Sequence, residues 1–316
     1  MKSIFRFLAV ALIATGALAQ TYPDRPIKLV VPFPAGGGAD GTARVFADKL
    51  AGVLGQAVVI DNRPGASGNI GAEQVARATP DGYTLLLGNE FLSTNPNLFK
   101  AMRYDSIKDF VPVTKIATSA VALAVHPAVQ AKSMQELIAL SKTKTINYAT
   151  PGVGTGPHLF GELLAMTTGA KLNHIPYKGA GPAMTDAVGG QVDLIISTLA
   201  PMVPFIASGK LRGLAVTGGG RSTQLPDMPT LAESGTPGFR YEIWYGVFAP
   251  AAVPKPILAR LQAASAQALA DPDLVARLRK AGFEPDAGTP DALAALVKSD
   301  QERWGKVVTD AKIPRE

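Results

Sequence analysis

The chain has 316 residues, of which 47% are hydrophobic and 18% are charged, so it is long enough for one large or two medium domains with real cores. It contains no cysteine, which excludes disulfides and thiolate metal sites. The formal net charge is +6, but the basic residues are scattered and aromatic residues make up only 7%, so the composition indicates no nucleic-acid partner. A modest positive field favours anionic ligands, although a slightly basic surface is as often without specific meaning.

The first 19 residues have the pattern of a secretory signal peptide. Lys2 and Arg6 give a basic start, residues 7–14 are apolar, and small residues precede Gln20. The apolar stretch is shorter than the ~20 residues of a membrane-spanning helix, which argues against an anchor. We predict cleavage after Ala19 and, in a Gram-negative source, a periplasmic protein. Loss of the two basic residues takes the formal charge from +6 to +4.

Strands alternate with helices in the first half of the chain. Residues 27–31, "IKLVV", form a continuous apolar run, which is typical of a parallel strand buried on both faces. The next segment has an apolar stripe at helical spacing from Ala43 to Val53. Further strands are predicted at "AVVID" and "DGYTLLLG", with a helix between them that ends at Ala76.

The pattern restarts near Ala120, where "VALAVHP" reads as a new strand. Ser133 and Glu136 have the spacing of a capping box at the start of a helix. The strands "INYAT", "LNHIPYKG", "VDLIIST" and "LRGLAVTG" then alternate with helices, and the tail reads as helical. This alternation predicts a parallel α/β architecture.

Two units of similar plan predict two lobes, between which the chain crosses near "TKIATSAV" and again near "YEIWYGVF". We expect the helical tail to return to the first lobe. The predicted first lobe comprises residues 20–121 and 247–316, and the second comprises residues 122–246.

Two glycine-rich loops carry the main functional signal. "PFPAGGGAD", residues 32–40, and "PGVGTGP", residues 151–157, each follow a strand and lead into a helix. Ligands of open parallel sheets bind beyond the carboxyl ends of the strands, and helix N-termini favour anions. One such loop is more often only a turn. A pair, one in each lobe, predicts two anion-binding lips that face each other across a cleft.

Other kinds of site fit the sequence poorly. The second loop begins like a dinucleotide fingerprint but has Pro157 at the third glycine position, and the first loop lacks the Gly-Lys-Ser/Thr ending of a phosphate loop. None of the three histidines has metal-ligand spacing: His126, His158 and His174. We therefore predict no catalytic residue, no metal and no cofactor. Core packing explains three aromatic residues as well as a pocket wall does: Phe33, Tyr177 and Trp244.

Several ordered segments resemble one family. "YPDRPIKLVVPFPAGGGAD", "NRPGASGNIGAEQVARATPDGYTLLLG" and "YKGAGPAMTDAVGGQVDL" are similar to the Bug family, the extracytoplasmic solute receptors of tripartite tricarboxylate transporters. The resemblance runs from Tyr22 to near the end of the chain. It implies a type II periplasmic-binding-protein fold of class α/β, with parallel or mixed sheets and a ligand cleft between two lobes. It also implies hinge closure on a small carboxylate and a membrane permease of two subunits, and we expect a monomer.

The resemblance also implies where the ligand binds. Its two loops correspond to residues 33–40 and 152–158, and further contacts follow three later strands. The candidate ligand-binding residues are Phe33, Ala35, Gly36, Gly37, Asp40, Glu90, Ser93, Gly154, Thr155, Gly156, His158, Lys178, Ser197 and Thr198. The backbone of residues 35–37 and the hydroxyl of Thr155 are the leading candidates. We expect Asp40 to orient its loop or cap the first helix, and His158 to cap or line the cleft.

Glu90 departs from the family pattern, in which small residues often follow "LLLG". A charged Glu90 near an anion site would repel a carboxylate unless it were paired or turned away. It is expected either to pair with a cation at the rim or to meet an amino or hydroxyl group of the ligand. Phe91 would form a ring wall for an aromatic acid or simply pack. An aliphatic dicarboxylate, an amino acid and an aromatic acid therefore all remain open as the ligand.

The sequence favours a binding protein that makes no covalent change. One alternative is a secreted hydrolase or isomerase on the same scaffold, which would need a nucleophile or base held in the cleft. Another is a sensory receptor that presents its ligand to a signalling protein.

Overall fold

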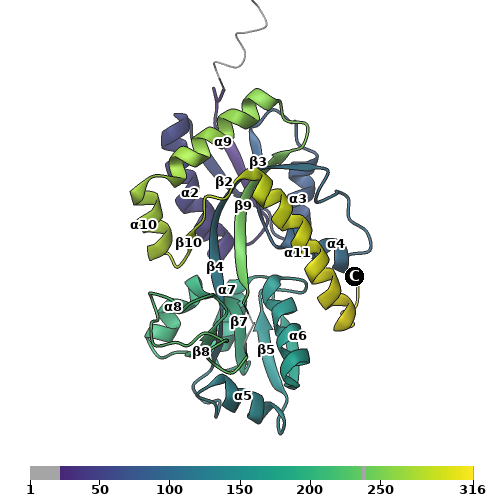
Figure 1. The fold of residues 1–316 in the computed structure, drawn as a ribbon, viewed down its shortest axis with the longest axis vertical. Coiled ribbons are helices and arrows are strands. Elements are labelled where there is room, and N and C mark those ends of the chain that lie inside the picture. Colours follow the sequence, from purple (N-terminus) through teal and green to yellow (C-terminus); the bar gives the residue numbers. More distant parts are fainter. Residues whose placement is uncertain (1–21, 237–239, 316) are drawn as a thin grey trace, which may run out of the picture.

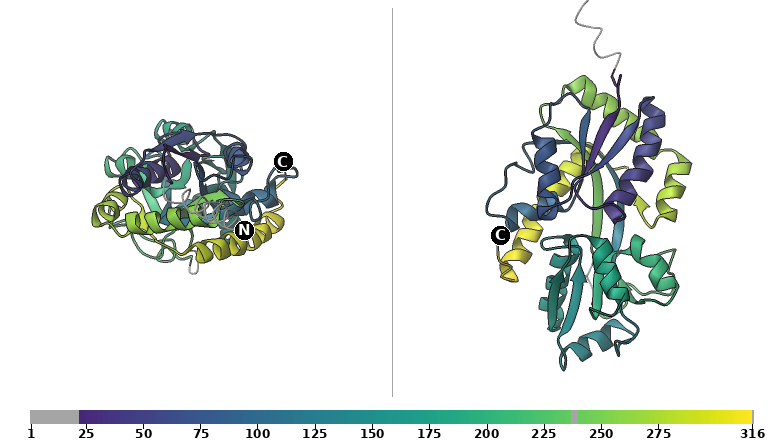
Figure 2. Two further views of the ribbon diagram at one scale, coloured as in Figure 1. Left: turned by 90° about the horizontal axis from the view of Figure 1, so that it is seen from above. Right: turned by 180° about the vertical axis from the view of Figure 1, so that it is seen from behind.

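The computed structural model describes residues 22–236 and 240–315, which form two lobes joined by long strands (Figure 1). The predicted signal peptide, residues 1–19, lies outside the described residues. The first lobe is built on the parallel strands β1 (Ile27–Val31), β2 (Val58–Asn62) and β3 (Thr84–Asn89), in the spatial order β2-β1-β3. The view from behind in Figure 2 shows these strands with helices on both sides.

The first βα unit follows directly from its sequence. Four of the five residues of β1 are buried, as a parallel strand covered on both faces requires. Helix α2 (Gly38–Leu54) buries a stripe at helical spacing that includes Phe46 and Leu50. The other elements before the crossing are the 3-10 turn η1 (Ala66–Gly68) and the helices α3 (Asn69–Ala76) and α4 (Phe91–Leu98).

The second lobe repeats this plan. Its strands are β5 (Ile146–Thr150), β6 (Leu172–Pro176), β7 (Leu194–Thr198) and β8 (Arg212–Val216). Its helices are α5 (Met134–Ser141), α6 (Gly156–Thr168), α7 (Ala180–Val188) and α8 (Leu199–Ala207). Strand β5 lies parallel to both β6 and β7. The predicted capping box is confirmed, because the Glu136 N–H donates to Ser133 Oγ over 3.2 Å.

Strand β4 (Phe110–Val125) runs through both lobes, as Figure 1 shows. Its residues 110–120 pair with β9 (Glu242–Pro250) in the first sheet, and residues 121–125 pair with β7 and β8 in the second. The sequence interpretation that a separate strand begins at "VALAVHP" is therefore wrong. Pro112 lies inside β4 at a register shift of the β4–β9 ladder, where its missing N–H is tolerated.

The predicted division at residues 121 and 246 stays a prediction. The ladder of β9 with β4 already begins at Glu242, and β9 also pairs with β3 in the first sheet. The pairing thus places all of β9 with the first lobe.

The remaining elements form the tail of the chain. They are α9 (Lys255–Leu269), α10 (Pro272–Lys280), β10 (Glu284–Pro285) and α11 (Pro290–Asp310). Helices α9 and α10 pack on α2, which agrees with the expected return to the first lobe. Helix α11 packs on α4 and β4 and also reaches α6 of the second lobe. Its buried Trp304 lies edge-on to Tyr241, with 5.2 Å between the ring centroids.

Truncation of the α2 stripe tests this packing. Phe46 is fully buried against the first sheet, so Phe46→Ala is expected to lower the free energy of unfolding by about 3–5 kcal/mol. Ile107 is half exposed, and Ile107→Ala is expected to change it by less than about 0.5 kcal/mol. Urea unfolding measures both. Equal effects of the two substitutions would contradict the placement of the core.

Candidate functional site

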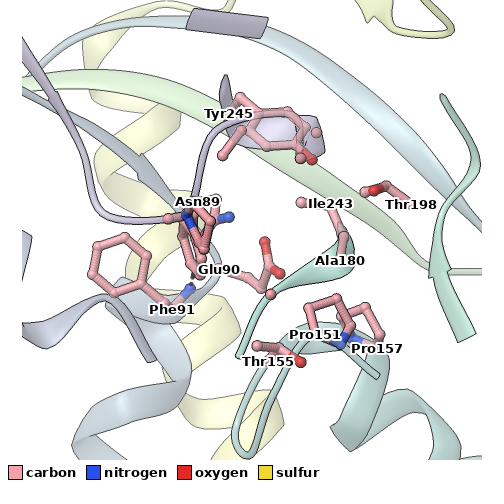
Figure 3. Close-up of a pocket in the computed structure, with 16 residues that line it drawn as sticks. Asn89, Glu90, Phe91, Pro151, Thr155, Pro157, Ala180, Thr198, Ile243 and Tyr245 are labelled. Atoms are coloured by element: carbon pink, nitrogen blue, oxygen red, sulfur yellow. Dashed lines mark hydrogen bonds between the residues drawn. The ribbon is translucent and has the colours of Figure 1, made fainter. Parts of the chain in front are cut away.

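A pocket lies between the lobes, at the carboxyl ends of the parallel strands (Figure 3). It holds 540 Å³ of empty space, part of it open to solvent, which suits a small organic molecule. The residues that line it come from both lobes and from β9. They are Phe33, Pro34, Gly37, Gly38, Ala39, Asn89, Glu90, Phe91, Pro151, Thr155, Pro157, Gly179, Ala180, Thr198, Ile243 and Tyr245.

The carboxylate of Asp40 holds the first-lobe loop in place. Asp40 accepts hydrogen bonds from the N–H of Gly36, from Arg44 Nε and from Asn62 Nδ2, at 2.9 to 3.1 Å. Burial works against the charged form, but these hydrogen bonds and the Arg44 charge outweigh it and lower the pKa of Asp40. Asp40 therefore orients the loop.

The structure corrects one expectation about this loop. The N–H of Gly36 is donated to Asp40, so it is not free for a ligand in this conformation. Ala35 and Gly36 are exposed and do not line the pocket, whereas Gly37 does. Gly36 has a φ of +83°, so glycine serves here to make the turn and not to let a ligand approach.

The second-lobe loop is organised by His158. Its Nδ1 accepts the N–H of Gly154 at 3.0 Å, and its ring stacks on His174 with 3.9 Å between centroids. Burial lowers the pKa of His158 to about 4, so the ring is neutral at pH 7 and Nδ1 can accept. His158 is itself buried and is not among the lining residues. Its function is to cap the loop.

This second loop rests directly on the first lobe. Ser67 Oγ donates to the carbonyl of Val153, and Thr94 Oγ1 donates to the carbonyl of Gly154 over 3.1 Å. A Cβ on Gly154 would lie 2.6 Å from Leu98 Cδ1 of α4, so the backbone approaches that helix closely. The two lobes are therefore in contact beside the pocket.

The other predicted residues divide into two groups. Thr155 and Thr198 line the pocket, and Gly156 lies beside it, since a Cβ there would be 2.8 Å from Glu90 Oε1. Ser93 instead donates to the carbonyl of Val297 in α11, away from the pocket. Lys178 is exposed and Ser197 is buried in β7, and neither lines the pocket.

Strand β9 supplies two pocket residues that sequence analysis missed. Side chains alternate along a strand, so Ile243 and Tyr245 face the pocket while Trp244 points to the opposite side. There Trp244 Nε1 donates to Asp300 Oδ2 at 2.9 Å. Tyr177 also leaves the pocket, because its hydroxyl donates to Asp186. The two-residue period of "YEIWYGVF" indicates a strand, but it does not show which face of that strand meets the ligand.

Glu90 is the one carboxyl group among the described lining residues, and it is buried. Figure 3 shows its carboxyl group pointing into the space between Tyr245 and Pro151. No salt bridge holds it among the described residues, so the expectation of a cation partner at the rim is wrong. Burial raises the pKa of Glu90 to about 8, although backbone N–H groups of Glu90 and Gly156 favour the charged form. Glu90 is therefore mostly neutral at pH 7.

The electrostatic field of the pocket comes from peptide groups. Five helices begin at its wall: α2, α4, α6, α7 and α8. Each N-terminus brings the positive end of its helix dipole to the pocket, although the N–H of Phe91 in α4 donates to Asn89 Oδ1 and that of Gly156 in α6 bonds to Glu90. None of the described lining residues is lysine, arginine or histidine. The site can thus attract an anion by aligned dipoles and hold an apolar body against Phe33, Phe91 and Ile243.

The described part of the chain contains neither a candidate metal site nor a candidate membrane-spanning helix. No group of three or more His, Asp or Glu side chains there has the arrangement of a metal site. Among the same residues, no helix has both the length and the apolarity to cross a bilayer.

Comparisons with known proteins agree with this geometry. Residues 42–313 match a family described as the tripartite tricarboxylate transporter family receptor. The chain is 38% identical to the periplasmic binding protein BugD, with a TM-score of 0.88 over 93% of this chain and 100% of BugD. It is 36% identical to Rpa4515 of Rhodopseudomonas palustris with adipate, with a TM-score of 0.89 over 93% and 100% of the two chains. It is 34% identical to MatC of the same organism with bound malate, with a TM-score of 0.85 over 91% and 100%.

These matches confirm the resemblance and the fold class that it implies. The similar proteins are solute-binding receptors and not enzymes, so the hydrolase or isomerase alternative is set aside.

The buried Glu90 makes the stability of the protein depend on pH. Its pKa is raised from 4.5 to about 8 in the folded protein. The stabilising contribution of the protonated group is full below pH 4.5 and is lost as the pH rises to 8, because the unfolded chain releases this proton first. Glu90→Gln has no such proton. The free energy of unfolding of Glu90→Gln minus that of the wild type is therefore expected to increase between pH 5 and 8, by at most about 1.4 kcal/mol per pH unit.

Urea unfolding at pH 5, 6, 7 and 8 measures this gain. Glu302 is exposed on α11, so Glu302→Gln is the matched control and should follow the wild type throughout. A Glu90→Gln curve parallel to that of the wild type would contradict a buried neutral carboxyl.

Proposed function

This chain belongs to the tripartite tricarboxylate transporter family of receptors, and from that premise we propose that it captures a small organic carboxylate in the periplasm and delivers it to transporter subunits in the membrane. The observation that carries the proposal is the pocket between the lobes, where five helix N-termini meet and no cationic side chain is found among the described lining residues. Backbone N–H groups at helix N-termini bind carboxylates well.

Two similar proteins support the class of ligand. One is described with adipate and the other with bound malate, and both are small aliphatic dicarboxylates. The pocket here has aromatic walls, because Phe33 and Phe91 lie edge to face with 5.8 Å between ring centroids. A carboxylate on an apolar body therefore matches both parts of this site.

Capture would work by closure of the two lobes. Pro34 of the first lobe approaches Gly179 of the second, where a Cβ would lie 2.9 Å from Pro34 Cγ. A ligand that touches both lobes favours the closed state by its differential affinity. The crossing strands β4 and β9 would carry the hinge motion, and a membrane partner would favour reopening.

A thermal-shift screen tests the proposed function. The probes are adipate, malate, aspartate and benzoate, which represent the three ligand classes that the sequence left open. At least one is expected to raise the melting temperature, since a ligand at a hundred times its Kd stabilises the folded state by about 2.7 kcal/mol. Tricarballylate and butylamine extend the range in size and charge. Stabilisation by the amine alone would contradict a carboxylate receptor.

Gly156 provides a test of closure. A Cβ at this position would lie 1.6 Å from Tyr241 Oη and 2.8 Å from Glu90 Oε1, so Gly156→Ala is expected to keep the second loop from seating. The affinity for the acid found in the screen should fall at least about tenfold, which corresponds to about 1.4 kcal/mol. Gly52 lies in α2 with no neighbour within 4 Å of an added Cβ, so Gly52→Ala serves as the control. Calorimetric titration of both variants gives the affinities, and unchanged binding by Gly156→Ala would contradict this closed geometry.

A further inference from the structure

The pocket holds a buried polar atom that the protein itself leaves unsatisfied. Glu90 is 4% exposed, and its Oε2 has no hydrogen-bond partner among the described residues. The carboxyl group points into the pocket in Figure 3. A buried polar atom without a partner costs free energy, so such atoms are rare unless a ligand or water satisfies them. This atom lies at the pocket wall between the lobes, which indicates that the ligand supplies its missing hydrogen-bond partner.

The surroundings of Glu90 decide which form of the carboxyl group is present. Tyr241, just before β9, and Tyr245 within β9 face it, and burial raises the pKa of both hydroxyls well above their ordinary range. Asp300 of α11 adds a like charge that also raises the pKa of Glu90. Asp300 accepts a hydrogen bond from Trp244 Nε1, and the charges of Arg303 and Lys115 favour its charged form. His158 of α6 is neutral, because burial lowers its pKa to about 4. No cation among the described residues is bonded to Glu90, so these groups together favour its protonated form.

Two ligand groups could in principle meet Glu90: an ammonium, which needs a charged Glu90, or a carboxylate, which needs a protonated one. An ammonium would lie among five helix N-termini, whose positive dipole ends repel it. A carboxylate is attracted by those same dipoles. The N–H of Gly156 already hydrogen-bonds to the Glu90 carboxyl, which leaves the other oxygen for the ligand.

We propose that Glu90 binds the ligand as a neutral carboxylic acid, donating a hydrogen bond from Oε2 to a carboxylate oxygen of the bound acid. This inference rests on the proposed function of the pocket as a carboxylate site. The hydrogen bond is charge-assisted, and such O–H···O⁻ bonds are short, about 2.5–2.7 Å, and strong. A carboxylic acid kept neutral by an apolar site is an established way to place a donor beside an anion. Glu90 thus replaces the cation that the pocket lacks.

The proposal makes binding depend on pH in one direction. The ligand carboxylate is ionised throughout the range from pH 6 to 9, so only the loss of the Glu90 proton changes the pair. Binding is expected to be constant at lower pH and to weaken as Glu90 ionises, because two carboxylates then face each other. With a Glu90 pKa of about 8, the affinity at pH 9 should be about tenfold lower than at pH 6.

Calorimetric titration of the intact protein at pH 6, 7, 8 and 9 measures this profile. The probes are adipate, malate, aspartate and benzoate. Glu90→Gln keeps a neutral donor but cannot ionise, so its affinity is expected to be a few-fold lower at pH 6 and flat across the range. Glu90→Ala removes the donor, and its affinity should be at least tenfold lower at pH 6. The exposed Glu302→Gln should retain the wild-type profile.

Each other outcome counts against a stated part of the account. If an acid binds but the wild-type profile is flat, or Glu90→Gln keeps the wild-type slope, the role of Glu90 is wrong while the carboxylate receptor stands. If binding strengthens with pH and is lost in Glu90→Gln, Glu90 binds an ammonium group as an anion. If no acid binds the wild type at any pH, the proposed function fails and the inference fails with it.

Discussion

The site depends on the cost of removing charge from water in a pocket whose described lining residues include no cationic side chain. Bare carboxylates are stable in such surroundings only when dipoles and hydrogen bonds replace the lost hydration. Five helix N-termini supply the dipoles here, while the protein's own buried carboxyl, Glu90, avoids the cost by keeping its proton. The same constraint explains why Asp40, which is also buried, is charged: it has three donors, one of them the cation Arg44, whereas no salt bridge to Glu90 is found among the described residues. Two buried carboxyl groups of the first lobe thus take opposite forms because their partners differ.

The lobes make this environment only when they meet. Glu90 belongs to the first lobe and Gly156 to the second, and the loop before Gly156 is bonded to Ser67 and Thr94 of the first. Strand β4 continues through both sheets, so we propose that the contact forms by bending at its middle and at the return into β9. In this proposal, ligand binding, lobe contact and the protonation of Glu90 are linked, since each needs the dry pocket that the others help to form. Helix α11 strengthens this link, because it packs on α4 and also reaches α6.

The sequence predicted the architecture well because periodicity reports it directly. The buried run of β1, the stripe of α2 and the paired loops all follow from local patterns that tertiary packing did not override. It failed where long-range contacts decide. The strand predicted at "VALAVHP" belongs to the end of the long strand β4, and no element was assigned to the helix α4, whose interior contains Pro96. In the site, the local pattern pointed to Thr155 and the family resemblance pointed to Glu90. The face of β9 that carries Tyr245 and the donation of the Gly36 N–H to Asp40 depend on the folded chain. The protonation state of Glu90 could not be predicted from the sequence either, because it depends on burial between two lobes.

The central claim is that a protonated Glu90 and the helix N-termini together bind a carboxylate in this pocket. A crystal structure of the wild type with the acid selected by the thermal-shift screen tests it most directly. The account predicts one carboxylate oxygen at about 2.5–2.7 Å from Glu90 Oε2, with the ligand body between Phe33 and Ile243. A ligand bound outside the space between the lobes, or one that presents a cationic group to Glu90, would contradict it.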